Sequence, residues 1–352
     1  MQRFIDTIKS KPNLAGQLRT LGIMPNIHDH VVDEGHFRGL FKQVLSLCRG
    51  IDAIMLHSHL WECSNPLLQS PESERHLLQL SLLNITGEEF RTFVRNFDHY
   101  ANLQVLELSM RMGLAFEAEA ERSFPGSITF PSLHTLVLGE LSWYASGVVL
   151  EWELPSLREL GLYGGLQEDL YPLILQSYQR LQFLDVAAEA LLHDFLHDVA
   201  QAPPHLKNVT LRMTAVCSRP PTNSAMKLFF QNIVTLGICQ LTEIRNIGYE
   251  WAEFVSDPTY MPHLRSVLTD MTFDSYCEYR EDPSSPVIEF LRWLEEVLSS
   301  RGVAIKGAMG DYSSFYLLNE TPSRLACPCF VVDWCSSPYQ HPSEGYQWNI
   351  NF

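Results

Sequence analysis

The sequence predicts an α/β solenoid in which strand–helix units repeat along the chain. Three observations predict this fold class: a recurring L-x-x-L-x-L pattern, its nearly constant spacing, and segments of helical period between successive copies. Ile or Val replaces some of the leucines, and the first apolar positions of successive copies lie 24 to 33 residues apart. A strand pattern of this kind that recurs about every 20–29 residues is typical of leucine-rich repeats. The ten copies lie at residues 18–23, 51–56, 77–82, 103–108, 133–138, 157–162, 181–186, 206–211, 233–238 and, in degraded form, 264–269.

Each copy is expected to form one strand with a single buried face. Apolar residues at positions 1, 4 and 6 of the copy alternate with variable residues at positions 3, 5 and 7. This period of two is that of a strand of which one face is buried. We therefore predict a horseshoe in which about ten parallel strands line the concave face and the helices lie outside.

The segments between the copies have the period of helices. Thr86 and Glu89 match a capping box at the start of one such segment. Pro286 stands where proline fits a first helical turn, and Gly302 stands where a C-cap is expected. Apolar residues at helical spacing mark these two segments and two others: Phe90, Phe93, Val94 and Phe97; Leu170, Leu173 and Ile174; residues 188–200; and residues 287–301.

The repeats assign residues 1–302 to one leucine-rich-repeat solenoid. Residues 303–352 are expected to form an irregular C-terminal cap, because an open last repeat would expose its apolar layer. Many such proteins place an asparagine two residues past each strand, and here other residue types stand there. The hydrogen bonds at the corners must then be made differently. The residues at that position include Arg111, Leu141, Gly165 and Thr214.

The charge of the chain argues against some classes of partner. The net charge is −16, and residues 101–200 hold fourteen Asp and Glu against four Arg and no Lys. So acidic a surface repels phosphate groups, which argues against nucleic acid and against a membrane surface. The N-terminal residues lack the apolar core of a signal peptide, and no apolar run reaches membrane-spanning length. We expect a cytoplasmic or nuclear protein that is not secreted, and its eight cysteines are too sparse for a disulfide scaffold.

The variable positions of the strands predict a binding surface on the concave face. Ten strands roughly 4.8 Å apart would line about 45 Å, which suits a folded protein or a long peptide. Small residues at many of these positions leave room for a partner, and aromatic and arginine side chains are typical of binding hot spots. Acidic residues flank the two aromatic rings, which favours a basic protein partner. The candidate partner-binding residues are Glu107, Glu159, Tyr163, Phe183, Asp185 and Arg212.

Three segments resemble the repeat region of a known family. Residues 4–21 have the order of a helix, a Pro-Asn-Leu-Ala turn and a first strand. The sequences Phe-Pro-Ser-Leu at residues 130–133 and Leu-Pro-Ser-Leu at residues 154–157 each lead into a predicted strand. In this order the segments resemble the F-box/leucine-rich-repeat family of mushroom-forming fungi, over roughly residues 1–300.

The resemblance implies that the repeats recruit a substrate for a cullin-based ubiquitin ligase. In that family an N-terminal F-box docks the adaptor of the ligase. No Leu-Pro-x-Glu helix precedes the first repeat of this chain. We therefore expect the F-box to be missing and the ligase adaptor not to bind directly.

Histidines leave a second class of function open, a metal-dependent hydrolase. His193 and His197 have the spacing of the H-E-x-x-H zinc motif, with Asp in place of the Glu base. His28, His30 and His57 follow the first two predicted strands and could be neighbours across stacked copies. The interpretation we favour is that both groups are unligated. No third ligand stands at a recognisable distance from the first pair, and only proximity supports the second group.

The remaining sequence motifs do not predict catalysis. No Gly-rich phosphate loop and no G-x-S-x-G motif occur. The spacing of Cys327, Cys329 and Cys335 is not that of a structural zinc site, so these residues are expected to pack in the C-terminal cap. We therefore expect a binding protein with no catalytic residues, no metal and no cofactor.

Overall fold

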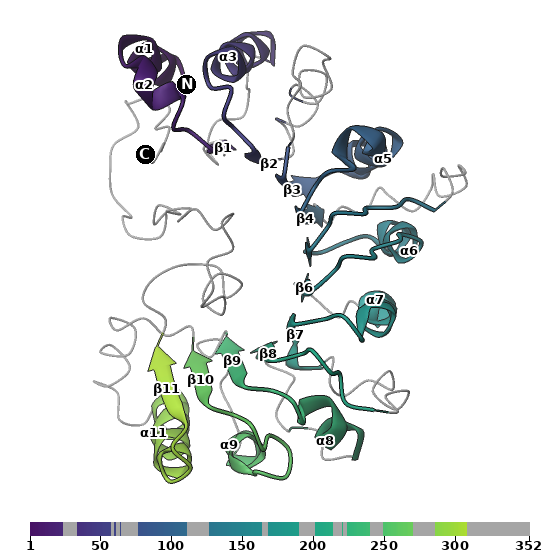
Figure 1. Cartoon of the computed structure of the whole chain (residues 1–352), viewed down its shortest axis with the longest axis vertical. Coiled ribbons are helices and arrows are strands. Elements are labelled where there is room, and N and C mark those ends of the chain that lie inside the picture. The colour runs from purple at the N-terminus through teal and green to yellow at the C-terminus, as the bar shows by residue number, and fades with distance from the viewer. Residues whose placement is uncertain are drawn as a thin grey trace. The chain divides into compact units, whose positions relative to one another are not determined.

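A computed structural model describes residues 1–23, 34–57, 60, 64, 77–110, 127–163, 168–189, 201–213, 220, 224–239, 249–269 and 286–307 (Figure 1). In these residues the fold is α/β, and eleven parallel strands form one open sheet whose order is that of the chain. The chain divides into two compact units, unit 1 within Met1–Ser156 and unit 2 within Leu157–Leu325.

Unit 1 contains five strands, and each pairs in parallel with the next along the chain. They are β1 (Thr20–Ile23), β2 (Ala53–His57), β3 (Gln79–Ile85), β4 (Val105–Met110) and β5 (Thr135–Leu138). The register joins equivalent positions of the sequence copies, so that Leu21 pairs with Ile54 and Ile54 with Leu80. The helices lie on one side of these strands in Figure 1. They are α1 (Gln2–Ser10), α2 (Pro12–Ala15), α3 (Glu34–Leu47), α5 (Gly87–Arg95) and α6 (Trp143–Leu150), with the 3₁₀ helix η1 (Phe97–Tyr100).

Unit 2 has the same organisation, with six strands in the order of the chain. They are β6 (Glu159–Leu162), β7 (Phe183–Ala187), β8 (Asn208–Arg212), β9 (Thr235–Cys239), β10 (Ser266–Thr269) and β11 (Ala304–Gly307). Its helices again lie on one side of the strands (Figure 1). They are the 3₁₀ helix η3 (Glu168–Leu170), α7 (Tyr171–Ser177), α8 (Ser224–Phe230), α9 (Tyr249–Ser256) and α11 (Pro286–Ser299).

The strand register predicted from the apolar pattern is confirmed. Each of the ten sequence copies contains a strand. The residues at positions 4 and 6 are buried in all ten strands, from Leu21 and Ile23 in β1 to Val267 and Thr269 in β10. A slip of one residue would turn these side chains to the opposite face, so burial of both positions fixes the register.

Three of the predicted helices are confirmed. The hydroxyl of Thr86 accepts a hydrogen bond from the backbone N–H of Glu89 at 3.3 Å, and Glu89 accepts one from the N–H of Thr86 at 2.6 Å. This capping box begins α5. The helix that includes Leu173 is α7, and α11 begins at Pro286. Gly302 has a φ of 69°, as expected where the chain leaves α11 for a strand. The segment predicted as helical at 188–200 lies almost wholly outside the described residues.

The repeats continue further along the chain than predicted. An irregular cap was predicted at residues 303–352. In the structure Ala304–Gly307 instead form an eleventh strand, which pairs with β10. Val303 is buried, Ala304 is exposed, and Ile305, which pairs with Val267, is only partly buried, unlike the residues at its position in the other copies. This segment lacks the leucines of the pattern and was therefore not recognised. Residues 308–352 lie outside the described part of the chain.

Hydrogen bonds of Asn84 join β2, β3 and β4 at one corner of unit 1. Asn84 has a φ of 53°, a conformation that asparagine tolerates better than most residues, and the register between β3 and β4 shifts beside it. Its backbone N–H donates to the hydroxyl of Ser109 at 2.9 Å. Its side-chain Nδ2 lies 2.9 Å from Nε2 of His57. A single asparagine within the bulge thus links three strands.

The described helices include none that is both long enough and apolar enough to cross a bilayer.

Candidate functional site

The structure brings three of the six predicted partner-binding residues together in unit 2. Tyr163 follows β6, Asp185 lies in β7, and Arg212 ends β8. Glu159 and Phe183 are paired neighbours at the start of β6 and β7. The sixth residue, Glu107, lies in β4 of unit 1.

Asp185 and Arg212 form a bidentate ion pair between adjacent strands. Nε of Arg212 donates to Oδ1 of Asp185 at 2.9 Å, and Nη2 donates to Oδ2 at 3.0 Å. The Asp185 side chain is fully buried, whereas that of Arg212 is 19% exposed. Two parallel hydrogen bonds between planar groups fix the orientation of the guanidinium as well as its position.

The guanidinium of Arg212 also lies over the aromatic ring of Tyr163, with Cζ 3.9 Å from the ring centroid. The two side chains come from strands that are separated by β7. Ala187 of β7, the strand between them, pairs with Arg212. A cation this close to a ring face is attracted by the ring quadrupole. We call Tyr163, Asp185 and Arg212 the Tyr–Asp–Arg cluster.

The charges of the cluster keep Arg212 ionised. Burial alone would lower the pKa of Arg212. The negative charge of Asp185 and its hydrogen bonds act in the opposite direction, with contributions from Tyr163 and Cys239, and the pKa of Arg212 is raised above its ordinary value. The cluster therefore presents a fixed, charged guanidinium plane beside an aromatic ring.

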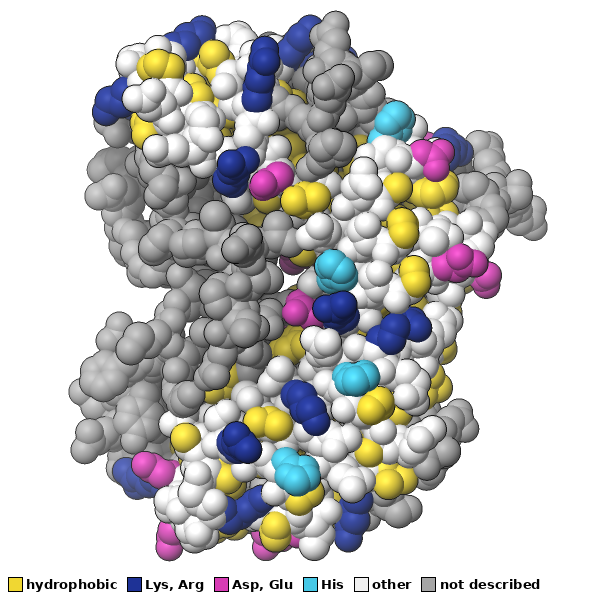
Figure 2. Space-filling model, viewed as in Figure 1, with side chains coloured by type: hydrophobic (Ala, Val, Ile, Leu, Met, Phe, Trp, Pro, Cys, Tyr) yellow, Lys and Arg dark blue, Asp and Glu magenta, His cyan; other side chains and the backbone are white. Residues whose placement is uncertain are grey.

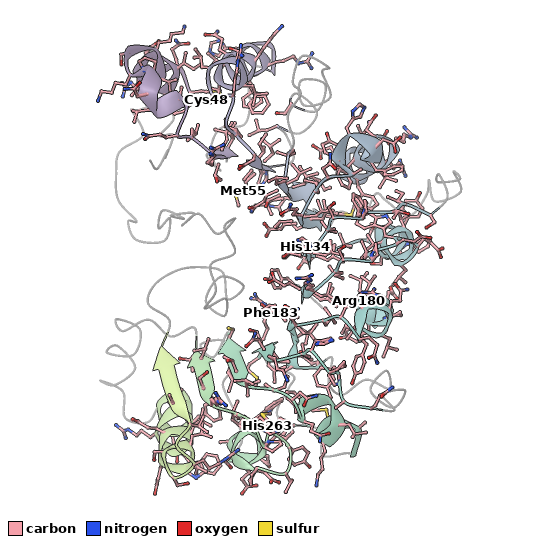
Figure 3. The ribbon with its side chains drawn as sticks, in the orientation of Figure 1. Cys48, Met55, His134, Arg180, Phe183 and His263 are labelled. Carbon is pink, nitrogen blue, oxygen red and sulfur yellow. The ribbon has the colours of Figure 1, made fainter. Side chains whose placement is uncertain are left out.

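Two of the six predicted partner-binding residues are buried, although the sequence suggested that they are exposed. Phe183 was expected to offer an exposed ring, and it is 1% exposed; Figure 3 places it on the side of β7 away from α7. Asp185 was expected to offer a free negative charge, and it is buried against Arg212. The alternation of a strand predicts which face a side chain takes, but it does not predict how far neighbouring side chains cover that face.

Glu107 occupies the middle of β4, between Ser81 of β3 and Val137 of β5. Burial raises the pKa of the Glu107 carboxyl, and the neighbouring Ser81 side chain opposes part of this rise. Glu107 is therefore less readily ionised than a surface glutamate.

The space above two of the small strand residues is filled by the protein itself. A Cβ built on Gly139, next to β5, would overlap the Cβ of Ser109 on the neighbouring strand. A Cβ on Gly237 of β9 would lie 2.6 Å from Oγ1 of Thr210. Only Gly22 of β1 has open space, with nothing within 4 Å, among these three glycines. The prediction that small residues leave room for a partner is thus wrong at Gly139 and Gly237.

The histidines proposed for a hydrolase lie mostly outside the described residues. His28, His30, His193 and His197 are among the residues not described, as are the three C-terminal cysteines. His57 is described, and its Nε2 lies beside the Asn84 amide. Within the described part of the chain, no three His, Cys, Asp or Glu side chains are grouped in a way that could hold a metal ion.

The Asp185–Arg212 pairing was not foreseen, although the sequence contains a signal for it. Asp185 stands at position 5 of its copy, and Arg212 stands at position 7 of the next. In a parallel sheet with in-register copies these two positions are diagonal neighbours, within reach of a long side chain. Opposite charges at positions 5 and 7 of successive copies therefore predict an ion pair rather than two separate anchors.

Neither models of known protein families nor any curated protein sequence matches this chain.

Proposed function

We propose that the chain is a leucine-rich-repeat solenoid that recruits a protein partner through the Tyr–Asp–Arg cluster of unit 2. The observation that carries this proposal is the guanidinium of Arg212, held at once by the buried Asp185 carboxylate and over the ring of Tyr163. The repeated strand pattern and the parallel in-register pairing of the strands support the repeat class.

The cluster has the properties of a binding hot spot. Tyrosine and arginine are enriched among the residues that dominate binding energy. The side chains of Tyr163 and Arg212 are both partly exposed, so each can still be covered by a partner. Because the ion pair already orders Arg212, a partner that covers it loses little additional side-chain entropy.

The charges of the cluster modify the expected chemistry of the partner. The prediction of a basic partner depended on Asp185 and Glu107 as negative charges on the strands. Arg212 neutralises Asp185, and burial makes Glu107 harder to ionise. We therefore propose a partner selected by a flat or aromatic group that stacks on the Tyr163–Arg212 pair, which lies in the same unit as the partly exposed Glu159.

The resemblance to F-box/leucine-rich-repeat proteins suggests why this chain would recruit a protein partner. In that family the repeats hold a substrate for ubiquitin transfer. The proposal for this chain is limited to the substrate-holding step, with the ligase adaptor expected not to bind these repeats directly. A metal-dependent hydrolase is not proposed, because no contact of the described histidine His57 favours it.

The proposal is tested by photo-crosslinking and then by affinity measurement. A photo-reactive amino acid in place of Asn208, a partly exposed residue of β8 that lies outside the cluster, should capture the partner from extracts of the native cells. Tyr163→Ala should then weaken binding of the identified partner by about thirtyfold, equivalent to about 2 kcal/mol for a hot-spot ring. Tyr163→Phe keeps the ring and should bind as the unmodified chain does. The matched control is Trp143→Ala, which removes an exposed ring from α6 of unit 1. An unchanged affinity of Tyr163→Ala would reject the cluster as the binding site.

A further inference from the structure

Six exposed basic side chains gather where the strands of unit 2 begin. Each lies one or three residues before the first residue of a strand. We call this group the basic edge. Figure 2 shows dark-blue and cyan side chains across the part of the view where Figure 1 labels β6 to β10, and Figure 3 labels Arg180 and His263. The basic edge consists of Arg158, Arg180, His205, Lys207, His263 and Arg265, all exposed.

Backbone hydrogen bonds place these residues along one edge of the sheet. The N–H of Gln182 donates to the carbonyl of Arg158 at 2.7 Å, and that of Lys207 donates to Gln182 at 3.1 Å. In the same way the N–H of Val234 donates to the carbonyl of Lys207 at 2.8 Å, and the N–H of Arg265 donates to the carbonyl of Val234 at 2.8 Å. Arg158, Lys207 and Arg265 therefore lie in one row across the sheet, directly before β6, β8 and β10. Arg180, His205 and His263 stand two residues before members of that row.

The basic edge is an exception in an acidic chain. The whole chain has a net charge of −16, yet four Lys or Arg and two His gather in these short segments. The acidic residues within six positions of these side chains in sequence are Glu153, Glu159, Asp185, Asp257 and Asp270. Asp185 is buried against Arg212, and Asp257 accepts a hydrogen bond from the N–H of Thr259 at 2.7 Å. At physiological salt the Debye length is about 8 Å, so a partner in contact with the edge responds mainly to the local positive charge.

We propose that the basic edge binds an acidic segment of a protein, rich in Asp and Glu, as a second surface separate from the Tyr–Asp–Arg cluster. Five adjacent strands at about 4.8 Å cover roughly 19 Å from the first to the last, which matches about six residues of an extended peptide. A run of carboxylates spaced along such a peptide meets one Lys or Arg at each of four of these strands, with a histidine beside two of them. Charge complementarity of this kind speeds association and sets the register of the partner.

An acidic peptide fits the edge better than nucleic acid does. Proteins that hold single strands combine basic grooves with exposed aromatic rings on which bases stack. In the described segments of the edge, the aromatic side chains Tyr178, Phe183 and Tyr260 are all buried. The strongly negative chain as a whole also repels a long polyanion, whereas a short acidic segment can reach the edge alone.

The test is a fluorescence-anisotropy titration of a labelled twelve-residue peptide of alternating Glu and Gly with the full chain at low salt. The double change Lys207→Glu with Arg265→Glu should weaken binding by at least about tenfold, because it places like charges opposite the peptide. The matched control, Arg38→Glu with Lys42→Glu, makes the same change of net charge on exposed residues of α3 and should leave binding within about twofold. Circular dichroism of both variants checks that they fold.

Three outcomes would overturn the proposal. One is no binding of the peptide by the unmodified chain. Another is an equal loss of binding in the two charge-reversed variants, which would mean that net charge alone is sensed. The third is tighter binding of a single-stranded oligonucleotide of the same charge, or of phosphatidylserine vesicles, than of the peptide. Tyr163→Ala should bind the acidic peptide normally, so failure of the basic edge is distinguishable from failure of the proposed function.

Discussion

The guanidinium of Arg212 neutralises a carboxylate, that of Asp185, which has no exposure to solvent. The pair joins β7 to β8 by two hydrogen bonds, of 2.9 Å and 3.0 Å, and its outer member remains 19% exposed. The two residues therefore do not depend equally on each other. Arg212 can still reach water if Asp185 is lost, whereas Asp185 cannot if Arg212 is lost.

This asymmetry predicts unequal effects of removing the two partners. Arg212→Met should destabilise the fold by about 3–5 kcal/mol, because it leaves a buried carboxylate without a cation. Asp185→Asn should cost less, about 1–3 kcal/mol, because it removes one charge and leaves Arg212 partly solvated. Urea denaturation monitored by circular dichroism measures both free energies of unfolding. The double variant Asp185→Leu with Arg212→Met should recover much of the loss. Equal losses in the two single variants would contradict the asymmetry.

Three glycines at the variable positions of the strands predict a matched series of stability changes. Gly139→Ala should destabilise by about 1–3 kcal/mol, since the new methyl group overlaps Ser109 on the adjacent strand. Gly237→Ala should behave in the same way, because its methyl group would lie 2.6 Å from Oγ1 of Thr210. Gly22→Ala has open space and should be neutral or stabilising by roughly 0.5 kcal/mol. Thermal unfolding of the three variants checks the order, and a destabilised Gly22→Ala with a tolerated Gly139→Ala would refute it.

Local patterns predicted much of the fold, and contacts between copies were harder to predict. The burial of Leu160 and the capping box of Thr86 follow from spacing within a few residues, so sequence alone could identify them. The burial of Phe183 and the Asp185–Arg212 pair depend on which side chains meet across neighbouring strands. A pattern within one copy does not contain that information. For the same reason the sequence predicted Tyr163, Asp185 and Arg212 as separate binding residues, whereas the structure brings them into contact.

The capping box of α5 predicts a specific and modest loss. Thr86→Ala should destabilise the fold by about 1 kcal/mol, because the N–H of Glu89 loses the acceptor it has at 3.3 Å. Thr86→Ser retains the hydroxyl and should be close to neutral. Native-state hydrogen exchange of the first turn of α5 measures the effect locally. A loss in Thr86→Ser as large as in Thr86→Ala would mean that the methyl group, rather than the cap, stabilises this position.

The raised pKa of Glu107 predicts how stability depends on pH. Because burial raises this pKa above its ordinary value of 4.5, the folded state binds the proton more tightly than the unfolded state does. Stability should therefore fall as the pH rises from that of the unfolded carboxyl through the raised pKa, and the full penalty should be present above it. Each unit by which the pKa is raised corresponds to about 1.4 kcal/mol.

Glu107→Gln removes the ionisable group and should make the chain more stable than the unmodified one at pH about 8, with a difference that shrinks towards zero as the pH falls to about 4. Ser81→Ala should have the opposite effect on the stability of the fold at high pH. It removes the side-chain hydroxyl that lowers the pKa of Glu107, so its loss of stability should be larger at high pH than at low pH. Urea denaturation of the three chains at a series of pH values measures these differences. A loss of stability in Glu107→Gln at neutral pH would show that the fold favours the ionised carboxylate, contrary to the argument from burial.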